Sequence, residues 1–304
     1  MKIALKSQGA GWVLDSIVKD YKKFSRHQIV SLNQDPDVLW SISLFSYPSI
    51  CSQVPQKCKK VIHVHHIDED KLPDYNFGSF NTADACLVPN KITEIVAKKY
   101  INIPIVRIPY WLLSSSTLPK DEAKIMKTKK QISNGEVLIG SFVKDGNGNN
   151  GNTPKLSKGP DILVDVLKKL HSRIKIKVVL AGYSRNYVVK SLDKLGIPYV
   201  YLKKHDDINT LYDCLDWYLV TSRSEGGPQS ILEASYRGIN ILSTKVGMSP
   251  EVLHTDCLCD GADDFVRKIL ANTNQTWYNK LSVRDKYMAE SMVSVYDDFF
   301  QSLR

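Results

Sequence analysis

The feature of the sequence that most restricts its fold is a regular alternation of short apolar runs and amphipathic runs. Apolar runs of strand length, such as "EVLIGSFV" (136–143) and "IKVVLAG" (176–182), alternate with helical patterns such as "DILVDVLKKLHSR" (161–173). Proline or glycine stands where several of these patterns begin or end, as is common at helix termini. Strands that alternate with helices indicate a parallel sheet covered on both faces. The second half of the chain is therefore predicted to be a doubly wound α/β domain.

The first half shows the same alternation in a less regular form. "KIALKS" (2–7), "VLWSISLF" (38–45) and "KVIHVHHI" (60–67) have strand patterns, and "WVLDSIVKDYKKF" (12–24) has helical spacing. A lysine-rich polar segment that begins at Ser114 then separates the two halves. Because 304 residues suffice for two domains, we predict two tandem parallel-sheet domains. Their strand ends are expected to face each other across a cleft, where such sheets bind ligands.

The composition indicates a soluble globular protein. The hydrophobic content of 43% and the charged content of 24% are ordinary for this class. No apolar run is long enough for a membrane-spanning helix, and the start of the chain lacks a signal-peptide pattern. The six cysteines form no C-x-x-C pair, which argues against a zinc site or a disulfide framework. A cytoplasmic protein with free thiols is expected.

Most of the net charge of +9 lies in the first 135 residues. A basic half suggests an anionic partner, which could be a membrane surface, an acidic glycan or nucleic acid, although the charge could equally serve solubility. No recognised nucleic-acid-binding motif accompanies it. We therefore expect no nucleic-acid partner, and we consider peripheral contact of the basic N-terminal domain with an anionic membrane.

The stretch "SRSEGGPQSILEA" joins an expected strand to an expected helix. Gly226 and Gly227 allow backbone conformations that other residues avoid, and Pro228 suits the first position of a helix. The helix then begins with unpaired N–H groups and a partial positive charge, which favour a phosphate. Glu225 precedes this helix start, and Glu233 follows about 8 Å further along the helix at 1.5 Å per residue.

A ligand with a central diphosphate could therefore meet one carboxylate on each side. Carboxylates bind hydroxyl groups by accepting charge-assisted hydrogen bonds. A nucleoside diphosphate sugar has this layout, with sugar hydroxyls on one side of the diphosphate and ribose hydroxyls on the other. The alternative is that both glutamates only favour the dipole at a helix start.

In its context this stretch resembles the donor site of glycosyltransferase family 4, a group of retaining enzymes with the GT-B fold. The resemblance is clearest over residues 211–253, looser over 136–253 and faint in the first half. It implies that Glu225 binds the hydroxyls of the donor sugar and that Glu233 binds the ribose. Backbone amides around Gly226, Gly227 and Pro228 would hold the diphosphate.

The segment "GSFVKDGNGNNGNTPKLSKGPD" supplies the second part of the resemblance. The family places an arginine and a lysine here, both on the diphosphate. Lys158, before Gly159, matches the lysine, whereas Ser141 stands in place of the arginine, and Lys144 or Lys155 could supply the missing charge. Such cations would stabilise the charge that the leaving nucleotide gains. The Gly/Asn-rich loop in this segment is expected to be mobile without a ligand.

The histidines of "VIHVHHIDED" lie at an expected strand end. Family members often carry a histidine here, near the reacting sugar carbon, and His65 is the better match, with His66 second. The alternative is an ordinary structural histidine. Asp68 and Asp70 form the D-x-D pattern of metal-dependent GT-A enzymes, but the surrounding sequence is GT-B-like, so we expect a polar loop. Near the N-terminus, Gly9 and Gly11 match a family loop that approaches the sugar and the acceptor.

The resemblance implies a retaining glycosyltransferase with a UDP- or GDP-sugar as its expected co-substrate. The acceptor would be a hydroxyl of a glycan, a lipid or a similar molecule. Neither a metal nor a further cofactor is expected. Glu225, His65 and Lys158 would be the catalytic residues.

The corresponding domains are an acceptor-side domain over residues 1–117, a donor domain over 118–283 and a C-terminal helix over 284–304. The resemblance implies that this helix packs back across the domain junction. Two alternatives remain, namely a non-catalytic nucleotide-sugar or glycan-binding protein and a sugar-nucleotide epimerase. The serine at 141 and the short first domain favour the former.

Overall fold

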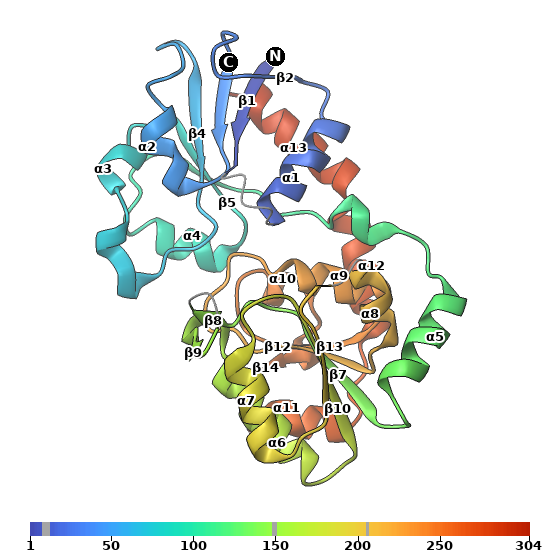
Figure 1. The fold of residues 1–304 in the computed structure, drawn as a ribbon. Coiled ribbons are helices and arrows are strands. Elements are labelled where there is room, and N and C mark those ends of the chain that lie inside the picture. Colours follow the sequence, from blue (N-terminus) through green and yellow to red (C-terminus); the bar gives the residue numbers. More distant parts are fainter. Residues whose placement is uncertain (8–12, 148–150, 205–206) are drawn as a thin grey trace. The chain divides into compact units, whose positions relative to one another are not determined.

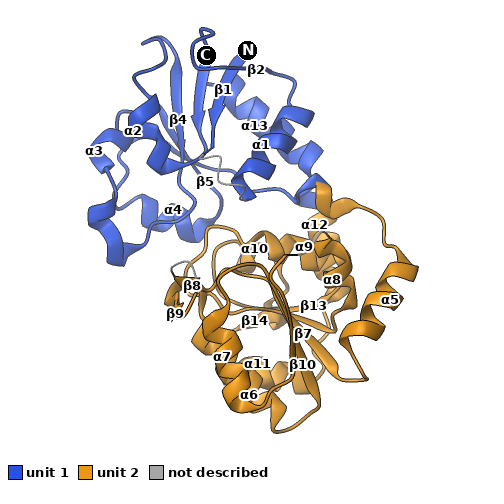
Figure 2. Ribbon diagram, viewed as in Figure 1, with its two compact units in different colours: residues 1–114, 285–304 blue, residues 115–284 orange. Residues whose placement is uncertain are grey.

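The structure is a computed structural model that describes residues 1–7, 13–147, 151–204 and 207–304. The chain divides into two compact units, one made of residues 1–114 and 285–304 and the other of residues 115–284 (Figure 2). Each unit contains a six-stranded parallel sheet among its described residues, with helices packed around it (Figure 1). The prediction of two doubly wound parallel-sheet domains is confirmed.

In the first unit the strand order is β2-β1-β3-β4-β5-β6, and all pairs are parallel. The order reverses between β1 and β3, which is where a sheet of this type has its topological switch point. The strands are β1 (Lys2–Lys6), β2 (Gln28–Val30), β3 (Val38–Ser41), β4 (Lys59–His63), β5 (Ala85–Val88) and β6 (Ile105–Arg107). The α-helices are α1 (Val13–Phe24), α2 (Tyr47–Ile50), α3 (Phe77–Phe80), α4 (Lys91–Ala97) and α13 (Ala289–Gln301).

The C-terminal helix α13 belongs to the core of the first unit, where it packs against α1. Trp40 of β3 is fully buried, and its ring lies 5.2 Å from the ring centroids of both Tyr296 and Phe300. The buried carboxylate of Asp297 accepts a hydrogen bond of 2.6 Å from the Tyr21 hydroxyl. The tail therefore completes the sheet's helical cover with both apolar and polar contacts.

In the second unit the strand order is β11-β10-β7-β12-β13-β14. Counted from β7 this is the 3-2-1-4-5-6 order of nucleotide-binding Rossmann folds, with the switch point between β7 and β12. The strands of this sheet are β7 (Val137–Ser141), β10 (Ile176–Ala181), β11 (Tyr199–Leu202), β12 (Trp217–Val220), β13 (Asn240–Thr244) and β14 (Leu258–Cys259). The α-helices are α5 (Glu122–Ile132), α6 (Pro160–His171), α7 (Asn186–Leu195), α8 (Ile208–Cys214), α9 (Gln229–Arg237), α10 (Ser249–Val252), α11 (Ala262–Leu270) and α12 (Thr276–Lys286).

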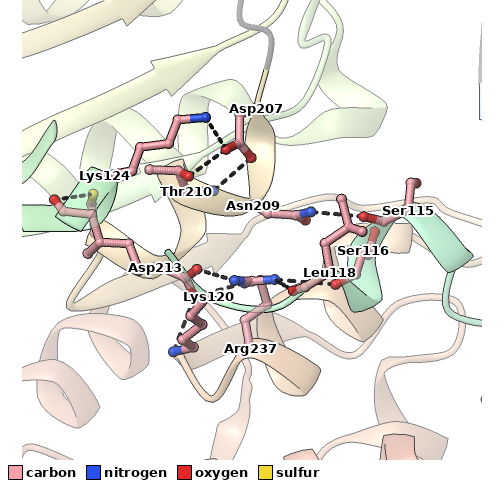
Figure 3. A network of polar contacts seen from close by, with 12 residues as sticks. Ser115, Ser116, Leu118, Lys120, Lys124, Asp207, Asn209, Thr210, Asp213 and Arg237 are labelled. Carbon is pink, nitrogen blue, oxygen red and sulfur yellow. Dashed lines mark hydrogen bonds and ion pairs between the residues drawn. The ribbon is translucent and has the colours of Figure 1, made fainter. Parts of the chain in front are cut away.

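The lysine-rich segment contains a helix, α5, which the sequence pattern did not predict. The Asp121 side chain caps the helix by accepting a hydrogen bond of 3.0 Å from the backbone N–H of Lys124. The Lys124 ammonium group lies 2.6 Å from the carboxylate of Asp207, just before α8 (Figure 3). Contacts with α8 therefore hold a helix whose own sequence is weakly amphipathic.

None of the helices in the described ranges is both long and apolar enough to cross a bilayer. Among the described residues, two short 3₁₀ turns lie in the first unit, one spans the boundary between the units, and two lie in the second unit. They are η1 (Leu44–Ser46), η2 (Glu69–Asp74), η3 (Ser114–Thr117), η4 (Leu156–Lys158) and η5 (Thr255–Cys257). A two-stranded hairpin of β8 (Gly146–Asn147) and β9 (Thr153–Pro154) also follows β7.

Candidate donor site

The loops that follow β7 and β12 leave the carboxyl ends of two neighbouring strands at the switch point of the second sheet. This is the position at which open α/β sheets bind their ligands. The first loop carries Lys158 and the second carries Glu225. The topology thus brings together two segments that the sequence separates by more than sixty residues.

The side chains of Lys158 and Glu225 form an ion pair with 2.5 Å between Nζ and Oε2. Only 17% of the Lys158 side chain and 12% of the Glu225 side chain are exposed, so water screens the pair less than it would on the surface. The other carboxylate oxygen of Glu225 accepts a hydrogen bond of 3.0 Å from the Ser222 hydroxyl. Glu225 was expected to bind the donor sugar and Lys158 the diphosphate. In this structure the two side chains contact each other instead.

Backbone contacts hold the two loops together. Gly159 has a φ of +61°, and a Cβ atom there would lie 1.8 Å from the carbonyl oxygen of Thr221. The Thr221 hydroxyl donates a hydrogen bond of 2.9 Å to the carbonyl of Gly159. The carbonyl of Ser157 accepts hydrogen bonds from the N–H groups of Arg223 and Ser224. The glycine after Lys158 is thus required for this close approach as well as for its backbone conformation.

Arg223 adds a side-chain link between the same loops. Its guanidinium group makes two hydrogen bonds, of 2.7 and 2.6 Å, to the carboxylate of Asp161, and it also donates to the carbonyl of Leu156 at 2.9 Å. The paired hydrogen bonds fix the orientation of both groups. Sequence reasoning missed this contact, because nothing in the local pattern around Arg223 indicates its partner.

The helix α9 begins one residue later than its sequence indicated. Pro228 is the residue before the helix, with the expected φ of −62° but an extended ψ of 116°, and the first helical residue is Gln229. No side-chain hydrogen bond from Pro228 caps the helix. Gly247 packs beneath the turn, because a Cβ there would lie 2.8 Å from the carbonyl oxygen of Glu225 and 2.9 Å from that of Gly226. The turn that contains Gly226 and Gly227 is therefore supported from a third loop.

Glu233 lies in the middle of α9, and both of its carboxylate oxygens accept hydrogen bonds. Oε1 accepts from the Ser116 hydroxyl at 3.1 Å, and Oε2 accepts from the Tyr212 hydroxyl at 2.9 Å. Burial raises the pKa of Glu233, while these two hydrogen bonds act in the opposite direction. Neither donor was anticipated from the sequence.

The loop after β7 rests on a buried ion pair. Arg185 and Asp145 are both fully buried, with 2.9 Å between the guanidinium Nη2 and the carboxylate. The same guanidinium donates hydrogen bonds to the carbonyl and, at 3.2 Å, to the hydroxyl of Ser141. Ser141 is only 1% exposed, so its side chain lies beneath the loop. Lys144 is exposed nearby, and the N–H of Lys155 donates to the carbonyl of Asp145 at 2.8 Å.

The described part of the Gly/Asn-rich loop makes close backbone contacts. Residues 146–147 and 153–154 form the β8–β9 hairpin. A Cβ on Gly146 or on Gly151 would approach the backbone of Ser184 to 2.4 Å or less. Ser184 itself has a φ of +60°, which is uncommon for a residue other than glycine. Gly146 and Gly151 allow the loop to lie against the connection between β10 and α7, which contains Ser184. The sequence alone does not reveal this contact.

In the first unit, His65 follows β4 and both of its ring nitrogens are engaged. Nε2 lies 2.6 Å from the carbonyl of Ile42, and Nδ1 contacts the Tyr110 hydroxyl. A carbonyl can only accept, so Nε2 carries the proton and Nδ1 accepts from the tyrosine. Burial lowers the pKa of His65 to about 4. His65 is therefore a neutral, oriented side chain at neutral pH.

His63, two residues before His65 in the chain, is buried among aromatic rings. Its ring centroid lies 4.8 Å from that of His65, 5.3 Å from that of Tyr110 and 6.0 Å from that of Trp40. Neither ring nitrogen has a hydrogen-bond partner among the described residues. Burial lowers the pKa of His63 well below its ordinary value, because the charged form would lose its hydration without gaining a partner.

Substituting His63 by phenylalanine is expected to reduce the acid sensitivity of the fold. The unfolded histidine takes up a proton below about pH 6.5, whereas the buried one does not, so stability is present above that pH and is lost as the pH falls below it. We expect the melting temperature of the wild-type protein to fall more between pH 7 and pH 5 than that of His63→Phe. Circular dichroism measures this difference, with the exposed His171→Gln as the control. Equal falls in both proteins would contradict the prediction.

The remaining predicted positions are placed as follows. Gly9 and Gly11 lie outside the described residues. Asp68 pairs with Lys71 at 3.4 Å at the start of η2, and Asp70 lies in the same turn. Within the described ranges, no group of three or more histidine, cysteine, aspartate or glutamate side chains is placed to hold a metal ion.

Residues 154–270 match the family of glycosyl transferases group 1. This range contains both Lys158 and Glu225. No curated protein sequence gives a significant match.

Solved structures match most or nearly all of the chain at low identity. HepE of Anabaena in complex with UDP-glucose is 13% identical, with a TM-score of 0.75 and 99% of each chain covered. A glycosyltransferase of Rickettsia africae is 15% identical, with a TM-score of 0.72 and coverage of 99% of this chain and 97% of that one. Sucrose-phosphate synthase of Thermosynechococcus elongatus is 14% identical, with a TM-score of 0.70 over 88% and 74% of the two chains. At these identities the matches establish the shared fold.

Proposed function

We propose that the chain is a glycosyltransferase of group 1 that transfers a sugar from a UDP-sugar to an acceptor hydroxyl with retention of configuration. The family match over residues 154–270 and the GT-B fold support this proposal. The observation that carries the proposal is the pairing of Lys158 with Glu225 at the switch point, beside the start of α9. UDP is favoured over GDP because HepE, which shares the fold over its full length, was solved with UDP and with UDP-glucose.

The ion pair suggests how a donor is received. A diphosphate offers Lys158 a new anion, and the sugar hydroxyls offer Glu225 new hydrogen-bond donors. When a donor binds, the ion pair between Lys158 and Glu225 would therefore be replaced by contacts of Lys158 with the diphosphate and of Glu225 with the sugar. In this arrangement Glu225 orients the sugar, and the amides around Gly226 and Gly227 bind the diphosphate at the positive end of the helix.

Lys158 and the helix N-terminus would then act most strongly as the glycosidic bond breaks. The diphosphate gains negative charge at that moment, and fixed positive groups stabilise it without reorganising. A catalytic role for His65 on the acceptor side would require that the substrate replace one of its two contacts, to Ile42 or to Tyr110. No step in this scheme requires a metal ion.

We further propose a hydroxyl of a glycan or of a lipid-linked molecule as the acceptor, and a cytoplasmic location that includes the membrane periphery. The support is the excess of lysine and arginine in the first half of the chain, which would attract an anionic surface. All six cysteines are free thiols, as is usual in a reducing compartment.

A thermal-shift series with UDP, GDP and ADP tests the donor. A ligand that binds only the native state stabilises it by about 2.7 kcal/mol at one hundred times its Kd, so UDP should raise the melting temperature most. Glu233→Ala should reduce the UDP shift, whereas Glu290→Ala, at an exposed position of α13, should not. The absence of a shift with every nucleotide would contradict the proposal.

Product analysis distinguishes transfer from the alternatives. A retaining transferase releases UDP from a UDP-sugar in proportion to the glycosylated acceptor, and nuclear magnetic resonance of the product shows the anomeric configuration of the donor. An epimerase would convert the donor without an acceptor, and a non-catalytic binding protein would leave it intact.

A further inference from the structure

We propose that Ser116 and Tyr212 position the carboxylate of Glu233 for two neighbouring ribose hydroxyls, and that they thereby make the site select a ribonucleotide over its deoxy form. The inference rests on the proposed UDP-sugar donor and adds to it two residues outside the motif. It also assigns a function to the segment that follows the first unit, from which Ser116 comes.

The geometry at Glu233 carries the first step. The Ser116 hydroxyl donates to Oε1 and the Tyr212 hydroxyl donates to Oε2, at 3.1 and 2.9 Å. A carboxylate has about four acceptor positions, so each oxygen retains room for one further donor. Two fixed donors, one on each oxygen, determine the plane of the carboxylate, and with it the directions in which further hydroxyls are accepted.

The position of Ser116 is itself fixed from α8 and α9. Arg237 donates to the carbonyl oxygens of Leu118 at 3.0 Å and Ser116 at 3.4 Å, while its other nitrogens bind the carboxylate of Asp213 (Figure 3). Asn209 donates to the carbonyl of Ser115 at 2.9 Å. Three carbonyl groups in four residues are thus bound by side chains of the second unit.

This anchor is buried, which makes it rigid. The side chains of Arg237 and Asp213 are 2% and 1% exposed, and Ser116 is 2% exposed. Lys120 adds a further contact of 3.2 Å to the same carboxylate. The guanidinium group of Arg237 is buried, so water does not compete for its hydrogen bonds. Arg237 therefore holds the backbone around Ser116 in a position from which the Ser116 hydroxyl reaches Glu233.

Tyr212 is fixed by packing instead of by charge. Its ring lies 4.9 Å from that of Phe142 and 5.0 Å from that of Tyr218, and it is 1% exposed. Burial and the neighbouring Glu233 raise the pKa of its hydroxyl well above the ordinary value, so it remains a donor at every pH of interest. The two supports of Glu233 are therefore independent of each other, and each can be removed separately.

The test compares the binding of UDP and 2′,3′-dideoxyuridine diphosphate by isothermal titration calorimetry. Wild-type protein should bind UDP more tightly, because only UDP carries the two hydroxyls. In Ser116→Ala and in Tyr212→Phe we expect UDP affinity to fall about tenfold, which corresponds to about 1.4 kcal/mol. The affinity for the dideoxy compound should change less than about twofold, because it makes no use of the oriented carboxylate. Ser115→Ala, which removes an exposed hydroxyl one residue earlier, is the matched control and should bind both probes as wild type does.

The outcomes separate the inference from the function on which it rests. Failure of wild-type protein to bind UDP would overturn the proposed donor. Wild-type binding of UDP, with equal weakening of both probes in Ser116→Ala and Tyr212→Phe, would show a merely structural role and overturn the inference. Unchanged UDP binding in these variants would also overturn the inference, because Glu233 would then not need the hydroxyls of Ser116 and Tyr212. Tighter UDP binding would overturn it as well, because those hydroxyls would then compete with the ribose for Glu233.

Discussion

Replacing Lys158 by alanine is expected to lower kcat for sugar transfer by about 10²–10³-fold, the effect of removing one fixed donor to a developing negative charge. The substitution removes the cation that lies 2.5 Å from Glu225 and that we place on the leaving diphosphate. Because charge on the diphosphate grows towards the transition state, kcat should fall more than the affinity for the donor. Steady-state kinetics with varied UDP-sugar measures both quantities.

Lys168→Ala is the matched control for this experiment. Lys168 is an exposed lysine on α6, outside the site, and its loss changes the net charge of the chain equally. An equal loss of rate in the two variants would indicate a general effect of charge, and an unchanged kcat in Lys158→Ala would contradict the proposed role. Wild-type melting behaviour in both variants would confirm that the comparison is made between folded proteins.

Replacing Asp145 by alanine is expected to lower the free energy of unfolding by about 3–5 kcal/mol, the usual cost of leaving a buried charge without its partner. The guanidinium of Arg185 is fully buried against Asp145 and would keep only its hydrogen bonds to Ser141 and a weak one of 3.4 Å to the carbonyl of Ala181. Urea unfolding followed by circular dichroism measures the loss. Since the pair supports the loop that carries Lys158, donor binding should weaken as well.

Two further variants show whether the cost comes from the unpaired charge. The double variant Asp145→Leu/Arg185→Met removes both charges and should recover most of the lost stability, because well-packed apolar residues can replace a buried ion pair. Asp263→Ala removes a carboxylate that is 90% exposed and pairs with Lys169 at 2.8 Å on the surface, and it should cost less than about 1 kcal/mol. A loss for Asp145→Ala as small as that for Asp263→Ala would show that the buried pair is not required.

Local sequence patterns were sufficient for the architecture, and they located the segments of the candidate site. The two parallel sheets follow from apolar runs that alternate with helical spacing, since each element must bury an apolar face against the next. The turn around Gly226 was predicted from its two glycines, which allow a ligand to approach the backbone closely. Lys158 and the glycine after it were identified by their resemblance to the family motif. In the structure Gly159 does have a positive φ and lies against Thr221.

Local patterns do not reveal an environment that depends on distant parts of the chain. The composition of the Gly/Asn-rich loop did not reveal that its described part packs against the backbone of Ser184. His65 matched a catalytic position, and only the structure shows both of its nitrogens engaged, by Ile42 and Tyr110. Ser141 stood where an arginine was expected, and the structure shows a different arginine, Arg185, bound beneath it.

The sequence by itself determined the fold class, because the alternation of strand and helix patterns depends on periodicity within a few residues. Its resemblance to a family pointed to the E-x7-E segment and to Lys158. Only the tertiary structure decided which groups these residues contact. Lys158 meets Glu225 because β7 and β12 are neighbours at the switch point, and Ser116 reaches Glu233 across 117 positions of sequence. Hydrogen bonds and ion pairs depend on distances of about 3 Å, and those distances are set by the packing of the whole domain.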